Sequence, residues 1–472
     1  MGGWSKPAVA GLIALAVVAC GSTVPSPASA PSRATATGPT RVPPQPTSTA
    51  TPAGLAPKGP YVVLAGQNIG VWIANPDGSY PTKLTDQWLF GFDLHHALSP
   101  RGDRLATVAR NDDGYDLIEI RLPDGQTQLL AHLMSITREE EAVLTSEKAA
   151  AAMMISGYDN VAWQPPDGRL MAVSAATGGP TSDVYVVDAT TGEIRQLTDG
   201  PSQAIFPSWS PSGEFIYHVG VSLVPPFGGA VTGFNRVDGS WAVSVSDAEV
   251  VAQPPIMHPA DFGGWFDERH YLMTDRNGEI AMVDVATGEA TAILPDFCPV
   301  DDAAQSGVGG ALLLSVLPEA GCSSGAGIYL WDPAGGKDPV LLDSERAWEL
   351  QWLEESDVFD VYPIALFSAD GSRRSEPPVP DGSFHPAVSR GGTEAWYVIE
   401  NTQGRVVVRA AQDDWREILQ VKVAQLLWDP ATGETLLIAA QDGTLYAASA
   451  PDFEPRVMGH LGGSVEHGIW VP

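Results

Sequence analysis

Short apolar and β-branched runs alternate with turn-forming residues along most of the chain, most clearly between Ser182 and Val221. This segment reads VYVVD, IRQLT, FPSWS and FIYHVGV, separated by ATTGE, DGPSQ and PSGE. Strand-length runs divided by Gly, Pro and Asp turns at this spacing are typical of an all-β repeat and not of a helix. The segment therefore predicts four short antiparallel strands, which the rest of the chain repeats less regularly.

The best-preserved repeat, LTDGPSQAIFPSWSPSGEFIY, resembles the repeat of the TolB-type β-propellers. The positions that carry the resemblance are Leu197, Thr198, Pro207, Trp209, Ser210, Pro211, Gly213 and Ile216. Related fragments recur at 97–106, 161–172 and 426–439, and the chain closes with GIWVP. The resemblance implies a ring of four-stranded blades and protein partners in the cell envelope.

One strand of each repeat is expected to line the central channel. The candidates, by residue numbers, are 96–99, 161–164, 207–210, 263–266, 303–307, 350–353, 386–389, 425–428 and the C-terminal 466–472. We therefore predict an all-β protein: a single propeller over residues 61–472 with about eight or nine blades, or seven if two weak repeats are misassigned. The strand at 466–472 should close the ring by joining strands at 61–66, 70–75 and 82–85.

Two insertions interrupt the repeat. Residues 135–157 contain a capping box that begins at Thr137 and an alanine-rich run, which predict the only helix of the chain. Residues 221–240 are rich in Gly and Pro and predict a loop. Both should emerge on the same face of the propeller, so we assign function to this elaborated face; the alternative is that the insertions are neutral.

The N-terminus predicts the compartment. Lys6 and the apolar run 8–19 fit a signal peptide over residues 1–19, too short to span a bilayer. The sequence VVAC resembles a bacterial lipobox, which implies lipidation of Cys20; the alternative is an ordinary signal peptide with an incidental cysteine. Residues 20–60, rich in Ser, Thr, Pro and Ala, predict a disordered tether, and hence an extracytoplasmic protein anchored to a bacterial membrane.

The net charge limits the kinds of partner that we expect, and the cysteine positions predict a disulfide. With 26 basic and 57 acidic residues the formal net charge is −31, which opposes binding to nucleic acids and anionic membranes. Cys298 and Cys322 flank a predicted hairpin with its turn near Gly309–Gly310, so the two thiols should lie nearly opposite each other. In an oxidising compartment they predict a disulfide, the alternative being two free thiols.

Polar side chains are expected to converge where the inner strands begin. The candidate ligands are Asp93, His95, Asp261, Asp302, His385 and His467, with His96, Asp159, Asp301 and Glu466 beside them. Carboxylates and imidazoles could hold a divalent cation or a cationic ligand; the alternative is an ordinary solvated channel mouth. The GCSSG match at 321–325 is read as a loop, because no helix is predicted after it.

Aromatic residues of the connecting segments are a second candidate for binding. Trp88, Phe90, Phe92, Phe227 and Phe234 could form an exposed apolar patch, or could pack onto the propeller.

The favoured function is a lipid-anchored protein-binding or scaffolding module of the cell envelope, not an enzyme. It should act as a monomer without a cofactor, and its partner is an envelope protein or a small extracellular ligand. The alternative is a hydrolase or lyase with a metal or small ligand at the channel mouth.

Overall fold

The structure is a computed structural model of the whole chain. The residues that it describes are 32–33, 55, 59–88, 94–143, 146–157, 160–223, 234–248, 250–252, 263–274, 279–294, 297–307, 309–317, 324–345, 347, 349–353, 356–362, 364–374, 383–400, 402–410 and 413–471. Within these ranges, no helix combines the length and the apolar character that a membrane crossing needs. The predicted signal peptide and Cys20 lie outside the described residues.

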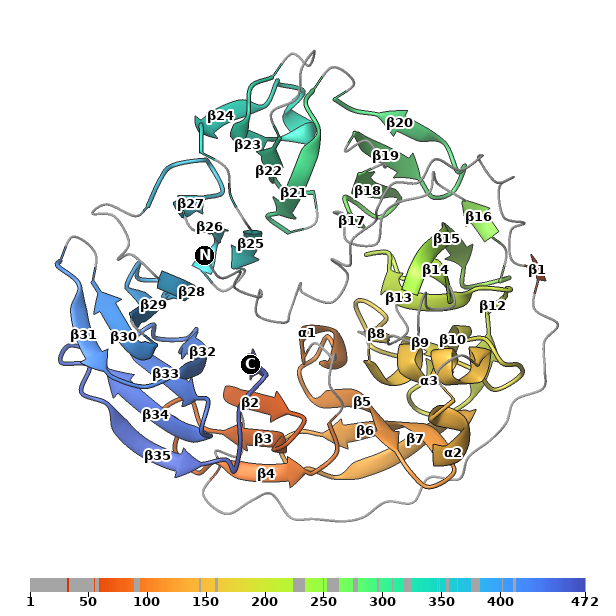
Figure 1. Cartoon of the computed structure of the whole chain (residues 1–472), viewed down its shortest axis with the longest axis horizontal. Helices are drawn as coiled ribbons and strands as arrows, with labels where there is room; N and C mark the ends of the chain where they lie inside the picture. The colour runs from red at the N-terminus through yellow and green to blue at the C-terminus, as the bar shows by residue number, and fades with distance from the viewer. Residues whose placement is uncertain are drawn as a thin grey trace.

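The protein is a nine-bladed β-propeller, with antiparallel blades arranged around a central axis (Figure 1). Seven blades have four named strands, ordered from the axis outward. They are blade 1, β36 (His467–Val471), β2 (Tyr61–Gly66), β3 (Gly70–Ala74) and β4 (Thr82–Thr85); blade 3, β8 (Val161–Trp163), β9 (Leu170–Ala175), β10 (Asp183–Asp188) and β11 (Ile194–Gln196); blade 4, β13 (Gln203–Trp209), β14 (Phe215–Leu223), β15 (Phe234–Ser244) and β16 (Val250–Ala252); blade 5, β17 (Gly263–Trp265), β18 (His270–Thr274), β19 (Ile280–Asp284) and β20 (Ala290–Ala292); blade 6, β21 (Val300–Gln305), β22 (Leu312–Val316), β23 (Gly327–Trp331) and β24 (Val340–Asp343); blade 8, β28 (Ser383–Val388), β29 (Glu394–Glu400), β30 (Gln403–Arg409) and β31 (Arg416–Leu419); and blade 9, β32 (Val423–Trp428), β33 (Thr435–Ala440), β34 (Thr444–Ser449) and β35 (Arg456–His460).

In the other two blades the described residues form three strands and a single bridge at the fourth position. Blade 2 contains β5 (Arg104–Arg110), β6 (Gly114–Arg121) and β7 (Thr127–Ser135), and Leu98 bridges to Leu105 at the inner position. Blade 7 contains β25 (Glu349–Leu353), β26 (Val358–Tyr362) and β27 (Ala365–Ser368), and Arg373 bridges to Phe367 at the outer position. The predicted all-β propeller of eight or nine blades is confirmed, with nine.

The ring closes as the sequence predicts. Strand β36 pairs with β2, with Val62 opposite Trp470 and Leu64 opposite Gly468. Every residue of β2 is buried, as expected for a strand covered on both faces. A Cβ atom at Gly468 would lie 2.6 Å from Leu427 Cδ1 of blade 9, so glycine at this position lets the closing strand approach its neighbour.

Apolar side chains between neighbouring blades make up the core. Val62, Leu64 and Trp470 of blade 1, for example, pack in one cluster with Leu437 and Ala439 of blade 9. The β-branched and apolar runs thus cover both faces of the blades and fix each blade against the next.

Helices occur only in connecting segments of the described chain. They are α1 (Leu94–Ala97), α2 (Arg138–Glu141), α3 (Glu147–Gly157) and the 3₁₀ turn η1 (Pro333–Gly335). The capping box is present in α2: Thr137 Oγ1 accepts a hydrogen bond from Glu140 N, and the Glu140 carboxylate accepts one from Thr137 N. Strand β12 (Thr198–Asp199) follows β11 along the chain.

Three sequence predictions need correction. The loop predicted at 221–240 is wrong at both ends, because β14 continues to Leu223 and β15 begins at Phe234. Helix α1 was not predicted, since a single turn has no periodic pattern. The tether predicted to be disordered contains β1 (Ser32–Arg33), which pairs with β12, and Leu55, which is buried in the core.

The predicted disulfide stays a prediction, because Cys322 lies outside the described residues. Its proposed partner Cys298 is buried, and its Sγ lies 2.7 Å from the carbonyl oxygen of Ser324.

Candidate functional site

Strand direction sorts the connections onto two faces. Because adjacent strands are antiparallel, the link between blades and the turn between the second and third strands of a blade emerge on one face. The α2–α3 segment links β7 to β8, and the β14–β15 connection joins the second and third strands of blade 4. Helix α1 lies in the link between blades 1 and 2. All three therefore share the elaborated face.

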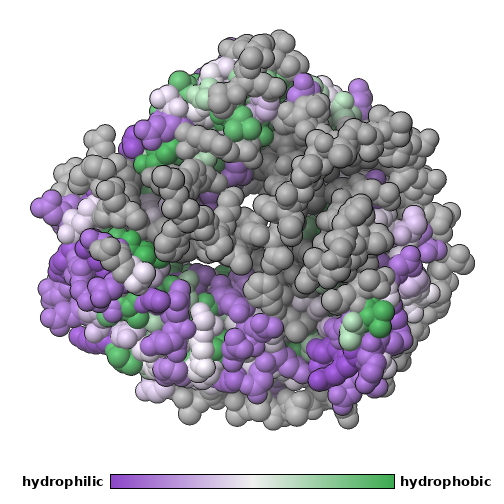
Figure 2. Space-filling view, in the orientation of Figure 1, coloured by the Kyte–Doolittle hydropathy of each residue, from purple (hydrophilic) through white to green (hydrophobic). Residues whose placement is uncertain are grey.

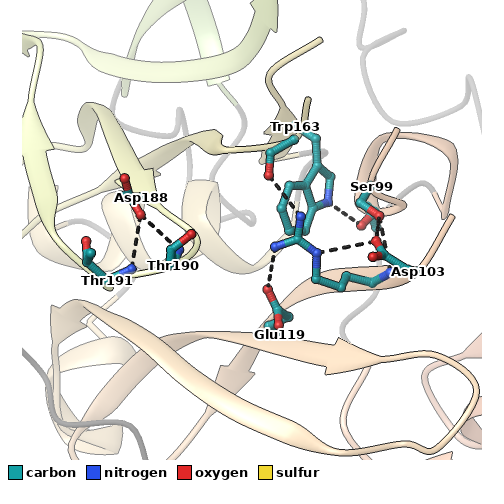
Figure 3. Close-up of polar contacts among 10 residues, drawn as sticks. Ser99, Asp103, Glu119, Trp163, Asp188, Thr190 and Thr191 are labelled. Carbon is teal, nitrogen blue, oxygen red and sulfur yellow. Dashed lines mark hydrogen bonds and ion pairs between the residues drawn. The ribbon is translucent and has the colours of Figure 1, made fainter. Parts of the chain in front are cut away.

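The turns of the opposite face are short and repetitive. In the turn after β10, Gly192 N donates to Asp188 O at 2.8 Å. The Asp188 carboxylate also accepts hydrogen bonds from Thr190 N at 2.9 Å and from Thr191 N at 3.0 Å (Figure 3). The same glycine-to-aspartate backbone bond, at 2.8 Å, recurs in the turns that follow Asp284 and Asp429. These turns satisfy their own polar groups, so this face presents a uniform surface.

A half-buried arginine joins blades 2 and 3 near the short turns of the opposite face. The Arg104 guanidinium lies 4.8 Å from the centre of the Trp163 ring and donates to Glu119 at 3.3 Å and to Gly168 O at 3.1 Å. Figure 3 labels Trp163 and Glu119 of this group. Burial raises the pKa of Glu119, and Arg104 opposes the rise. The arrangement fixes the position of the blade that carries the first insertion.

A network of hydrogen bonds that was not predicted from the sequence joins helix α2 to blade 2. Arg110 donates to Glu141 Oε2 at 3.1 and 3.2 Å, to Gly114 O at 3.0 Å and to Ile136 O at 3.2 Å. Tyr115 donates to the other oxygen of Glu141. Burial, and then this bond to Glu141, raise the pKa of Tyr115 to about 12. Because α2 is too short to be stable alone, this network gives the insertion its fixed position.

Near the axis, the predicted His95 and His467 lie on elements that contact each other. His95 is exposed on α1, which packs against β36 and β8. His467 is half-buried on β36, and its ring centre lies 6.4 Å from that of Trp88. Trp88, a candidate for an exposed patch, is 3% exposed, so that interpretation is wrong for this residue.

Asp302 has a structural role. Its carboxylate accepts hydrogen bonds from Ala303 N at 2.9 Å and from Leu350 N at 2.8 Å, which joins the inner strands of blades 6 and 7. Its two oxygens therefore already accept backbone hydrogen bonds.

The side chains of the remaining predicted ligands and aromatic candidates lie outside the part of the chain that the structure describes. Asp93 and Asp261 lie outside the described residues, as do Asp159, Phe90, Phe92 and Phe227. His385 lies on β28, Asp301 on β21 and Phe234 on β15, with side chains outside the description. Among the side chains that the structure does describe, no group of three or more His, Cys, Asp or Glu is placed to hold a metal ion.

Comparison with known sequences gives limited similarity. No family model matches the chain. A stretch of 58 residues is 43% identical to "Uncharacterized peptidase YuxL" of Bacillus subtilis, covering 12% of this chain and 9% of that protein. A stretch of 254 residues is 24% identical to "Uncharacterized protein Atu1656" of Agrobacterium fabrum, covering 48% of this chain and 80% of that protein.

Comparison with solved structures gives weak similarity at low sequence identity. The C-terminal WD40 domain of Sif2 is 13% identical, with a TM-score of 0.41 over 77% of this chain and 99% of the domain. Acylaminoacyl peptidase of Pyrococcus horikoshii is 13% identical, with a TM-score of 0.36 over 75% of this chain and 50% of that one. An oligogalacturonate lyase in complex with manganese is 10% identical, with a TM-score of 0.34 over 85% of this chain and 84% of that one. The chain thus matches only half of the peptidase chain.

Proposed function

We propose that the protein is an extracytoplasmic, lipid-anchored β-propeller that binds a protein of the cell envelope through its elaborated face. The main observation behind the proposal is that the long connections lie on one face of the propeller and the short turns lie on the other. The insertions between β7 and β8 and within blade 4 share one face, whereas the opposite turns are short and uniform. Rigid scaffolds commonly bind through such variable connections.

The exposed charges near α2 favour a basic partner. Asp112 and Asp113 in the β5–β6 turn and Glu139 and Glu140 on α2 are exposed, and they outnumber the nearby cations Arg138 and Lys148. Lys148 pairs with Glu140 at 2.8 Å, which leaves an acidic surface. Where described residues are coloured, the face drawn in Figure 2 is mostly hydrophilic, with hydrophobic residues in small separate groups. Electrostatic complementarity would then set partner choice and association rate more than affinity.

Anchoring through Cys20 and a TolB-type repeat complete the proposal. The first rests on the signal-peptide pattern and the second on the repeat around Trp209. Labelling of growing cells with a radioactive fatty acid tests the anchor: Cys20→Ser should abolish incorporation and release the protein from the membrane fraction. Incorporation that persists in Cys20→Ser would exclude this anchor.

Site-specific photo-crosslinking in the native envelope tests the binding face. A photoreactive amino acid at Glu139, on exposed α2, should give a defined cross-linked band, whereas the same amino acid at Glu193, in an exposed turn of the opposite face, should not. Asp113→Lys should weaken the band and Glu193→Lys should leave it unchanged.

Deletion of part of the blade 4 insertion gives a second test. The deletion should be confined to residues 224–233, because β14 and β15 contribute the flanking residues to the blade. Equal cross-linking from both faces, or a band whose intensity Asp113→Lys does not change, would contradict the assignment of binding to the elaborated face. In that case a small ligand or a metal at the channel mouth becomes the next hypothesis, and elemental analysis its test.

A further inference from the structure

Three polar side chains form a continuous hydrogen-bonded relay at the edge of blade 2. His132 Nδ1 lies 2.8 Å from Asp116 Oδ1, and His132 Nε2 lies 2.8 Å from Ser135 Oγ. Asp116 is on β6, and His132 and Ser135 are on the outer strand β7. A second donor, Asn111 Nδ2, holds the other oxygen of Asp116.

A β-bulge makes this arrangement possible. On β7, Met134 pairs with Tyr115 and His132 pairs with Asp116, so Leu133 is an extra residue without a partner on β6. In a regular strand, residues three apart point to opposite faces; the bulge brings His132 and Ser135 to the same side. Leu133 and Met134 are fully buried, and Ser135 is exposed.

Glycine at position 114 allows the backbone around Ser135 to approach closely. Gly114 pairs with Ser135 and has φ +148, and a Cβ atom there would lie 1.8 Å from Met134 O and 3.0 Å from Ser135 Cα. Any other residue would displace the end of β7 and with it Ser135 Oγ.

The partners fix the direction of each hydrogen bond. A carboxylate only accepts, so Nδ1 of the neutral imidazole carries the hydrogen and donates it to Asp116. Nε2 is then left with its lone pair and accepts from the Ser135 hydroxyl. This is the order of roles found in serine nucleophiles that are activated by a histidine and oriented by a carboxylate.

We propose that Ser135 is an activated nucleophile that attacks carboxylic esters, with His132 as its general base and Asp116 as the positioning residue. Ser135 Oγ forms a bond to the ester carbonyl carbon while its proton passes to His132 Nε2. The tetrahedral intermediate collapses with cleavage of the carbon–oxygen bond, and the alcohol leaves with the proton from His132. Water then hydrolyses the acyl–serine, again with His132 as base, and restores the hydroxyl.

The position of the relay on the surface limits the kind of ester that can reach Ser135. The relay lies on the outer strand of its blade and not at the axis, and the His132 side chain is 37% exposed and that of Asp116 18%. An ester presented at a surface can reach Ser135 without entering the channel.

Labelling with an alkyl fluorophosphonate tests the nucleophile in the full-length protein. Attack by Ser135 forms a phosphorus–oxygen bond and expels fluoride, and peptide mass spectrometry should find the adduct on Ser135. Ser135→Ala should abolish it, and His132→Gln should lower the rate about 100-fold, a typical contribution of a general base. Ser449→Ala is the control, because Ser449 is exposed and the one described hydrogen bond of its hydroxyl is with the hydroxyl of Thr435.

The role of Asp116 is tested by separating inactivation from binding. Asp116→Asn should lower the maximal inactivation rate and leave the half-saturating probe concentration unchanged, since it alters the tautomer and not the surface. Release of p-nitrophenol from p-nitrophenyl acetate should follow the same order of variants. All variants should keep the wild-type unfolding midpoint. Labelling of Ser135 no faster than of Ser449, or labelling unaffected by His132→Gln, would overturn the proposal.

Discussion

The indole nitrogen of Trp209 donates a hydrogen bond to the carbonyl oxygen of Ala162 at 2.8 Å, joining the inner strands of blades 4 and 3. Trp163 makes the equivalent bond to Ala97 O at 2.7 Å. The same bond recurs from Trp428 to Ala387 O at 2.9 Å and, with a hydroxyl as acceptor, from Trp265 to Ser208 Oγ at 3.2 Å. The tryptophan of the repeat therefore connects each of these blades to the preceding one.

Removing one such bond should destabilise the ring measurably. Trp209→Phe keeps an aromatic ring but leaves the Ala162 carbonyl without its donor, so we expect a loss of about 1–3 kcal/mol in the free energy of unfolding, measured by urea denaturation. Trp470→Phe is the matched control: Trp470 Nε1 is buried and has no partner among the described residues, so its removal should be neutral or stabilising. Equal losses in both variants would show that ring packing, not the hydrogen bond, is responsible.

The sequence predicted the ring because repetition averages out local errors. Each of the nine expected inner strands coincides with a strand or, near Leu98, with a bridge. The closing strand followed from the apolar pattern of HGIWV and from the missing inner strand of the first repeat. Such features depend on period and on turn residues, both of which are visible in a single chain.

Side-chain constellations were much harder to predict. The relay of Asp116, His132 and Ser135 depends on the bulge at Leu133, which has no sequence signal because its residues are ordinary for a strand. Two interpretations were open for Trp88, an exposed patch or packing onto the propeller, and the structure shows it buried in a core cluster. Asp302 was one of the candidate ligands at the channel mouth, and its carboxylate accepts a backbone hydrogen bond from the next blade, which the sequence did not indicate.

A buried ion pair in blade 8 should be sensitive to the loss of one partner. Arg409 Nη2 lies 3.0 and 3.1 Å from the two oxygens of Glu394, directly across β29 and β30, and the two side chains are 3% and 7% exposed. Arg409→Met leaves a buried carboxylate without its cation, so we expect a loss of about 3–5 kcal/mol in urea denaturation. The double variant Arg409→Met/Glu394→Leu should recover most of it, and a double variant no better than the single one would contradict this account.

Reduction should destabilise blade 6 if Cys298 and Cys322 are joined. The Cys298 backbone nitrogen donates to Ser324 Oγ at 2.9 Å, and Ser324 follows Cys322 by two residues in the sequence. Peptide mapping of the denatured, unreduced protein should recover the two cysteines in one disulfide-linked species. Cys322→Ala should lower the free energy of unfolding by roughly 3 kcal/mol, the entropic contribution of closing a loop of this size. Complete alkylation of both thiols without a reductant would disprove the bond.

Asp360 should make the protein less stable as the pH rises. This carboxyl lies between blades 7 and 8, and its Oδ1 has no partner among the described residues; burial, with a smaller effect of Glu349, raises its pKa to about 8. Between the ordinary pKa of about 4 and this value, the native state holds a proton that the unfolded chain releases. In this range the native state binds more protons than the unfolded chain, so the free energy of unfolding falls as the pH rises, by up to about 1.4 kcal/mol per pH unit. The stabilisation of the native state by the protonated Asp360 carboxyl is therefore complete below a pH of about 4 and is lost as the pH approaches 8. Asp360→Asn, which cannot ionise, should raise the urea midpoint at pH 8 and flatten the difference between pH 5 and pH 8, whereas Asp338→Asn at an exposed position should change neither. Parallel pH profiles for the wild type and Asp360→Asn would show that this carboxyl is not the source of the dependence.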